Sequence, residues 1–156
     1  MSFASPSRPD DSQVDPRFRY VRRIEVRFGD LDALGHVNHV NYLTYVEQVR
    51  TAYFHDVLGI DVPAGLTWVI ARVSCEYLLP LAFGDVVEVG WRLSRLGRAS
   101  ADYEFVLMRG ADTVARGDGV LVNSDARAAR SAPIPDAWRT AAAAFDDIAP
   151  RAPRNL

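Results

Sequence analysis

The chain has 156 residues, of which 49% are hydrophobic and 24% are charged, the size and composition of one ordinary globular domain. The formal net charge of -2 and the lack of any run of Lys or Arg argue against a nucleic-acid partner. The only cysteine, Cys75, excludes an internal disulfide and gives no metal-ligand spacing, so we expect no metal site.

The start of the chain lacks the apolar core of a signal peptide, and no stretch of about eighteen apolar residues suggests a membrane span. Together with the single cysteine, this predicts a cytoplasmic protein without a membrane partner. Residues 1–17 hold three of the nine prolines, interspersed with Ser and Asp, and are expected to form a disordered leader. A flexible tail is expected over 149–156, which leaves 18–148 as a single folded domain.

The first predicted element is a strand over residues 20–28, where apolar and polar residues alternate imperfectly. A polar loop follows. Between 41 and 58 the apolar residues recur at steps of three and four, which predicts a largely buried helix. Asn38 is a suitable N-cap for this helix, and Gly59 is a suitable stop because glycine adopts left-handed backbone angles without steric cost.

Four strands without intervening helices are expected after this helix. The first of them alternates apolar and polar residues up to Pro80, and the others repeat the same period of two. Gly97 and Gly110 fall at the breaks, so we expect short hairpins and antiparallel pairing. An Ala-rich segment near the end predicts a terminal helix. The expected strands cover residues 69–79, 87–93, 101–107 and 113–122, and the helix covers 136–145.

One early strand, a buried helix and four consecutive antiparallel strands can share a core if the sheet curls around the helix. The sequence therefore predicts an α+β protein with a curved antiparallel sheet of about five strands wrapped around one long central helix, plus a short C-terminal helix. This arrangement is the hotdog fold.

The loop before the helix carries the most specific pattern in the chain. Residues 26–50 read VRFGDLDALGHVNHVNYLTYVEQVR, with an Asp-x-Asp pair, a glycine, a His-Val-Asn run, and then a tyrosine and an acidic residue on the helix. This composite resembles the signature of the 4-hydroxybenzoyl-CoA thioesterase family of hotdog proteins. Later segments are similar to the family's further strands, so the resemblance covers about residues 20–124. The matching residues are Asp30, Asp32, Gly35, His36, Val37, Asn38, Tyr42 and Glu47.

The resemblance implies hydrolysis of the thioester bond of an acyl-coenzyme A, with Asp32 as either the nucleophile or the general base. A carboxylate beside a helix start lies near free backbone N–H groups and the positive end of the helix dipole. Those N–H groups can bond the thioester oxygen as it gains negative charge. The family pattern makes the backbone N–H of His39 the leading donor. No cofactor is implied, since coenzyme A is part of the substrate.

Three further motif residues, His36, Asn38 and Tyr42, are expected to contact the substrate. Each has an ordinary structural alternative: His36 as a cap or surface residue, Asn38 as the N-cap, and Tyr42 as a packing residue. Asp and Asn before a helix also occur in any turn that leads into an N-cap, so the whole loop has a purely structural interpretation as well.

Other polar residues receive narrower interpretations. Asp30 is expected to hold the loop in shape by accepting backbone hydrogen bonds. Glu47 is expected to form an ion pair with Arg50 three residues later on the helix. Coenzyme A carries phosphates, and Arg95 and Arg98 in the predicted third hairpin are the leading candidates to bind them.

The resemblance also implies a homodimer or homotetramer, in which a second subunit completes the substrate cleft. Two other functions stay open. One is a hydratase or dehydratase acting on an acyl thioester. Such enzymes resemble a different pattern, with a Gly-Asp-x-Asn-Pro segment or a His-Phe-Pro run, and this sequence contains neither. The other is a non-catalytic acyl-CoA-binding module. The preferred acyl group is not defined by the sequence.

Overall fold

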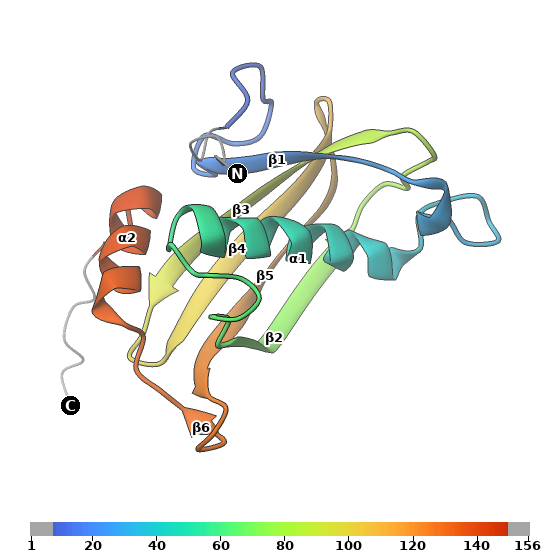
Figure 1. Ribbon diagram of the computed structural model, residues 1–156. Coiled ribbons are helices and arrows are strands. Elements are labelled where there is room, and N and C mark those ends of the chain that lie inside the picture. Colours follow the sequence, from blue (N-terminus) through green and yellow to red (C-terminus); the bar gives the residue numbers. More distant parts are fainter. Residues whose placement is uncertain (1–7, 150–156) are drawn as a thin grey trace.

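The computed structural model describes residues 8–149, and Figure 1 shows how their six strands, two α-helices and one short 3-10 helix are arranged. The expected order of elements is confirmed. No helix among the described residues is long and apolar enough to cross a membrane. The elements are β1 (Tyr20–Glu25), η1 (Phe28–Asp30), α1 (His39–Asp56), β2 (Trp68–Tyr77), β3 (Val86–Leu96), β4 (Ser100–Arg109), β5 (Asp112–Asp125), β6 (Arg130–Ser131) and α2 (Asp136–Asp146).

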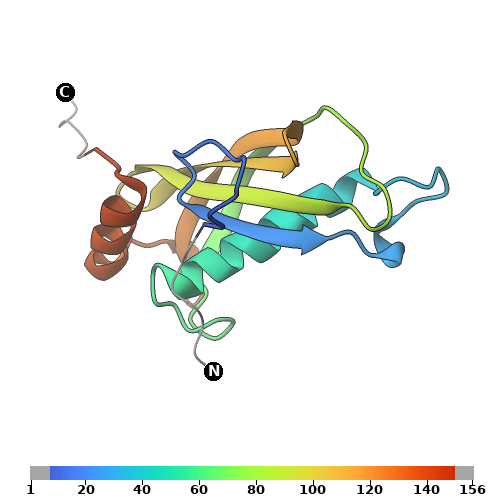
Figure 2. The same ribbon diagram turned by 90° about the horizontal axis from the view of Figure 1, so that it is seen from above.

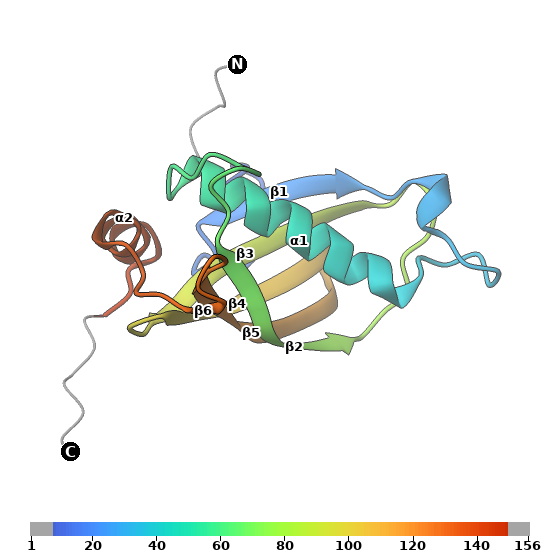
Figure 3. The ribbon, with the colours of Figure 1, turned by 60° about the horizontal axis from the view of Figure 1, so that its bottom comes forward.

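The sheet has the strand order β1-β3-β4-β5-β2, and every pair in it is antiparallel. The strands β1 and β2 therefore form its two edges, although they flank α1 in the sequence. The sheet curls so that α1 runs across one face, between these edges (Figure 3). The short strand β6 pairs with the end of β5. This arrangement is the predicted hotdog fold.

The helix α1 begins and ends where its sequence signals predict. The side chain of Asn38 accepts a hydrogen bond from the N–H of Val40 at 3.1 Å, as an N-cap does. Gly59 follows the helix with φ of +68°, a conformation that side chains with a Cβ rarely adopt. Tyr53, on the inner face of α1, is fully buried and packs with its ring centroid 4.7 Å from that of Trp91 on β3.

Two glycines on β5 make room for aromatic rings of β4 under the helix. A Cβ on Gly119 would lie 2.4 Å from the Tyr103 ring, and a Cβ on Gly117 would lie 2.5 Å from the Phe105 ring. Both rings are almost completely buried. These glycines, which are adjacent positions on one face of the strand, therefore serve core packing within the chain.

The terminal helix α2 docks through one buried carboxyl. Asp146 accepts hydrogen bonds from the Tyr53 hydroxyl at 2.6 Å and from the Leu93 N–H at 2.9 Å. Burial raises the pKa of Asp146 to about 6, against the lowering effect of the bonds from Tyr53 and Leu93. The second oxygen, Oδ1, has no partner among the described residues.

The segment 8–18 differs from expectation. Most of it falls in the expected disordered leader, but it lies against the sheet on the side away from α1 (Figure 2). Val14 and Phe18 are buried over Gly90 on β3, where a Cβ would lie 2.8 Å from a Val14 methyl group.

The guanidinium group of one residue, Arg8, holds this segment in its folded shape. It donates hydrogen bonds to the backbone carbonyls of Ser12, Val14, Asp15 and Phe18. Charged donors that satisfy several carbonyls at once order an otherwise irregular chain. Residues 1–7 of the expected leader, and 150–156 of the expected tail, lie outside the described residues.

Candidate active site

The motif loop is a small, ordered turn that projects beyond the start of α1 (Figure 1). A bridge between Leu31 and Val37 closes it, and inside the bridge the N–H of Asp32 donates to the carbonyl of His36 at 2.9 Å. Gly35 takes φ of +77°, which explains why this position of the turn suits glycine. The loop therefore presents its polar residues on a fixed backbone.

Asp30 anchors the loop, as predicted. Its buried carboxylate accepts hydrogen bonds from the Tyr45 hydroxyl at 2.7 Å and from the backbone and guanidinium of Arg27. Burial acts to raise the pKa of Asp30, but the bonds from Arg27 and Tyr45 outweigh burial and lower it. The carbonyl of Asp30 also accepts the N–H of Asn38 and the side-chain amide of Asn41, both at 2.9 Å, which ties the loop to the helix start.

Asp32 has a different environment from Asp30. Its side chain is exposed, and Oδ1 accepts the N–H of Leu34 at 2.9 Å, an Asx-turn contact. Among residues 8–149, Oδ2 has no hydrogen-bond partner. Asp32 is not among the residues that line the five main hollows of residues 8–149. Its carboxylate is therefore free to act on a bound molecule, but one chain alone does not enclose it.

The first turn of α1 leaves one backbone donor unused. The N–H of Asn38 donates to Asp30, that of Val40 to the Asn38 side chain, and that of Asn41 to the Asn38 carbonyl. Within the part of the chain that the structure describes, the N–H of His39 donates to no acceptor. An unpaired N–H at a helix N-terminus is a suitable group to bind an oxygen that gains negative charge.

An apolar groove of about 240 Å³ opens at this helix start. The Tyr42 hydroxyl donates to the carbonyl of Leu79 at 3.0 Å, which fixes its ring in the groove wall. The Tyr77 ring meets the rings of Tyr42 and His39 edge-on, with centroids 5.2 Å and 5.9 Å apart. The groove is lined by Val37, His39, Tyr42, Tyr77, Leu78, Leu79 and Pro80.

The structure brings together some of the predicted site residues. Tyr42 and His39 share the groove, and the loop of Asp32 adjoins it through the helix start. His36 is exposed in the loop, and its ring makes no hydrogen bond within residues 8–149. The side chain of Asn38 is engaged as the N-cap. Contact of His36 or Asn38 with substrate stays a prediction.

Arg95 and Arg98 lie elsewhere. They belong to the β3–β4 hairpin, which is at the α2 end of the sheet, opposite the start of α1 (Figure 1). Arg95 forms a two-bond pair with Asp102, at 2.6 Å and 3.0 Å. Within a single chain these arginines are therefore separate from the motif loop, and their binding of coenzyme A stays a prediction.

Tyr77 and Leu79 form much of the groove wall, although the sequence motif does not include them. The alternation expected up to Pro80 in fact stops at Tyr77, because Leu78 is apolar as well, and this short apolar run is the sequence signal that could have indicated the groove wall.

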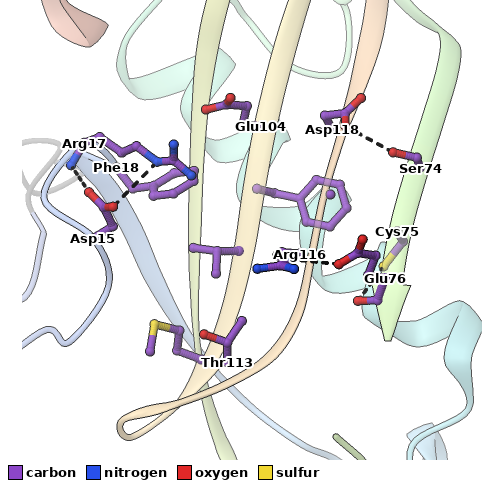
Figure 4. Close-up of a pocket in the computed structure, with 14 residues that line it drawn as sticks. Asp15, Arg17, Phe18, Ser74, Cys75, Glu76, Glu104, Thr113, Arg116 and Asp118 are labelled. Carbon is purple, nitrogen blue, oxygen red and sulfur yellow. Dashed lines mark hydrogen bonds and ion pairs between the residues drawn. The ribbon is translucent and has the colours of Figure 1, made fainter. Parts of the chain in front are cut away.

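A larger hollow, of about 550 Å³, lies on the outer face of the sheet, away from α1 (Figure 4). Several of its polar side chains pair with one another: Arg116 donates to Glu76 at 2.8 Å, and Ser74 donates to Asp118 at 3.2 Å. None of the predicted site residues lines it. No group of three or more His, Cys, Asp or Glu residues among the described residues is arranged to hold a metal ion.

Comparison with known proteins identifies the family. The model of the thioesterase-like superfamily matches residues 26–143. A thioesterase from Thermus thermophilus, solved in complex with coenzyme A and Zn, is 38% identical with a TM-score of 0.72, and the match covers 81% of this chain and 93% of that one. A thioesterase superfamily protein from Jannaschia sp. CCS1 is 28% identical with a TM-score of 0.75, covering 84% and 85% of the two chains.

A curated relative gives a shorter match. The uncharacterized protein YsmA of Bacillus subtilis (strain 168) is 26% identical over 89 residues, which is 57% of this chain and 60% of that protein. The family match, by contrast, extends from the end of β1 into α2. The chain belongs to the thioesterase-like superfamily.

Proposed function

We propose that this protein hydrolyses acyl-CoA thioesters to the free carboxylic acid and coenzyme A. The observation that carries the proposal is the N–H of His39, which has no acceptor among the described residues. It lies at the first residue of α1, beside an apolar groove and next to the loop of Asp32. The similarity to a thioesterase solved with coenzyme A supports this choice of substrate class.

In the proposed reaction the thioester oxygen accepts a hydrogen bond from the His39 N–H, and this bond strengthens as the oxygen gains negative charge. The Asp32 carboxylate either attacks the carbonyl carbon, giving an anhydride that water then cleaves, or removes a proton from the attacking water. In both routes the C–S bond breaks, and the sulfur leaves as the thiolate and takes up a proton. One water is consumed for each acid and thiol released.

We also propose that the active unit is at least a homodimer formed through β2. This edge strand and the residues that follow it expose large apolar side chains, and an uncovered apolar edge favours pairing with another strand. A second copy paired there would enclose the exposed Asp32 and the groove. The exposed residues are Val69, Ile70, Val73, Tyr77, Leu78 and Leu79.

The test is to incubate the purified protein with several acyl-CoAs and to follow thiol release, in parallel with the Asp32→Asn variant. We expect a loss of roughly a thousandfold in kcat for Asp32→Asn, because a positioned catalytic base or nucleophile contributes on that order. Asp10→Asn, at an exposed aspartate of the N-terminal segment, is the matched control and should keep full activity.

Other outcomes would overturn the proposal. Loss of enoyl-CoA absorbance without thiol release would indicate a hydratase. Stabilisation of the protein by acyl-CoA with neither signal would indicate a binding module. Thiol release that persists undiminished in Asp32→Asn would exclude the assigned role of that carboxylate.

A further inference from the structure

A second, smaller hollow of about 220 Å³ lies between the middle of α1 and β2. Most of its wall is apolar, but it also contains a buried arginine and a buried tyrosine, neither of which the thioester chemistry above uses. Its lining residues are Val40, Leu43, Thr44, Val46, Glu47, Arg50, Ile70, Val73 and Tyr103.

Arg50 is a nearly buried cation with little compensation. Its side chain is 10% exposed, and its one hydrogen bond within residues 8–149 is a contact of 3.4 Å from Nη2 to Glu47 Oε1. The predicted pair with Glu47 exists, but the Glu47 side chain is 65% exposed and so adds little. Burial lowers the pKa of Arg50. Most N–H groups of this nearly buried guanidinium are therefore free to bond an acceptor that enters the hollow.

Tyr103 also lines this hollow, and its hydroxyl is a second unused group. The residue is 1% exposed, and its hydroxyl has no hydrogen-bond partner among the described residues. A buried hydroxyl without a partner is destabilising, so a fold that keeps one at a cavity wall gains when an oxygen acceptor enters. Both Arg50 and Tyr103 donate hydrogen bonds, so they favour the same kind of ligand.

The hollow lies next to the groove at the helix start, along both α1 and β2. Val73 lines the hollow and Tyr77 lines the groove, and they point to the same face of β2, two steps of the strand period apart. On α1, Val40 of the hollow directly follows His39 of the groove. Arg50 lies about 16 Å from His39 along the helix axis. An acyl group whose carbonyl is held at His39 therefore has a path along α1 toward Arg50.

We infer that Arg50 and Tyr103 bind an oxygen acceptor at the far end of the acyl group, so that the enzyme prefers acyl-CoAs with a terminal carboxylate. This inference rests on the proposed thioesterase function. A carboxylate matches the fork of N–H donors on a guanidinium, and the apolar wall suits the methylene chain before it.

The test compares pairs of substrates that differ only in the terminal carboxylate, adipoyl-CoA against hexanoyl-CoA and suberoyl-CoA against octanoyl-CoA. We expect kcat/KM to favour at least one dicarboxylic substrate by on the order of tenfold or more. Arg50→Met should abolish this preference, and Tyr103→Phe should reduce it while retaining the ring. Arg116→Met, at an exposed arginine of the outer face, should leave it unchanged.

Several results would overturn the inference while the thioesterase function stands. One is equal kcat/KM within both pairs. Another is an Arg50→Met variant that lowers both members of a pair equally and also loses its oligomeric state in sedimentation, since Arg50 would then bind the second copy. If Arg50→Met fails to fold, Tyr103→Phe decides, and an unchanged preference in it overturns the inference.

If no acyl-CoA is hydrolysed, the proposed function fails and the inference is judged by binding alone. Calorimetric titration of the protein with suberoyl-CoA and octanoyl-CoA then decides it. Tighter binding of suberoyl-CoA that is lost in Arg50→Met supports the inference, and equal affinity overturns it.

Discussion

Asp30 and Asp32 are two residues apart, yet the backbone gives them opposite environments. Asp30 is buried and has four hydrogen bonds from Arg27 and Tyr45, so its carboxylate is fully used by the fold. Asp32 is exposed, and within residues 8–149 its carboxylate accepts one hydrogen bond, from the N–H of Leu34. Of these two carboxylates, that of Asp32 keeps an oxygen without a partner among the described residues, and the catalytic role that we propose for it requires such an oxygen.

A single methyl group at Gly119 tests the packing under α1. Gly119→Ala places a Cβ 2.4 Å from the Tyr103 ring and 2.5 Å from the carbonyl of Arg72, neither of which can move freely. We expect the free energy of unfolding to fall by about 1–3 kcal/mol, as overpacked cores do. Urea denaturation measures this. Gly29→Ala, where no atom lies within 4 Å, is the control and should change stability little.

At the scale of elements, the sequence predicted the strands and α1 well because their signals are local. The apolar spacing and the Asn38 cap indicated the helix start, and the period of two indicated the strands. The docking of segment 8–18 was not predicted because Val14 is an isolated apolar residue among polar ones, and its partner Gly90 is far away in the sequence.

The candidate site shows the same division between local and distant information. The motif indicated Asp32 and His39 from sequence alone. The roles proposed for Arg50 and Tyr103 depend on which side chains α1 and the sheet bury together, and no local pattern contains that. A helix arginine three residues after a glutamate is typical of a surface ion pair, and only the burial of Arg50 distinguishes it.

The contact of α2 with the core gives a pH-dependent prediction. The folded-state pKa of Asp146 is raised from 3.8 to about 6, so its contribution to stability is complete below about pH 4 and is lost as pH rises through about 6. Asp146→Asn removes this titration but keeps an acceptor for Tyr53 and Leu93. The stability of the wild type relative to Asp146→Asn should therefore fall by about 3 kcal/mol between roughly pH 4 and pH 7.

Urea unfolding of both proteins across this pH range measures the difference. Asp147→Asn, at the neighbouring residue, provides the reference for a substitution that leaves the buried carboxyl intact. A difference between wild type and Asp146→Asn that stays constant with pH would contradict the assignment of a raised pKa to Asp146.

At the scale of the whole molecule, the free edge of β2 leads to a prediction about assembly. Val69 is 50% exposed on this strand and lines none of the described hollows, so Val69→Asp perturbs the edge without altering a pocket wall. If β2 pairs with a second copy, the charge should weaken the dimer by roughly tenfold or more in Kd and lower thioesterase activity with it.

Analytical ultracentrifugation and thiol release, measured on the same samples, check this prediction. Val86→Asp is the matched control, because Val86 is 49% exposed but lies on β3, which is paired on both sides. An unchanged sedimentation coefficient for Val69→Asp would show that β2 is not the dimer contact.

The segment folded around Arg8 has a practical consequence for anyone trimming this protein. Val14 and Phe18 cover Val21 and Met108, so cutting away the first eighteen residues would bare a hydrophobic patch on the back of the sheet. Versions shortened to improve crystallisation should therefore be the most prone to aggregate. An affinity tag is best placed before Arg8, so that Val14 and Phe18 still cover the patch.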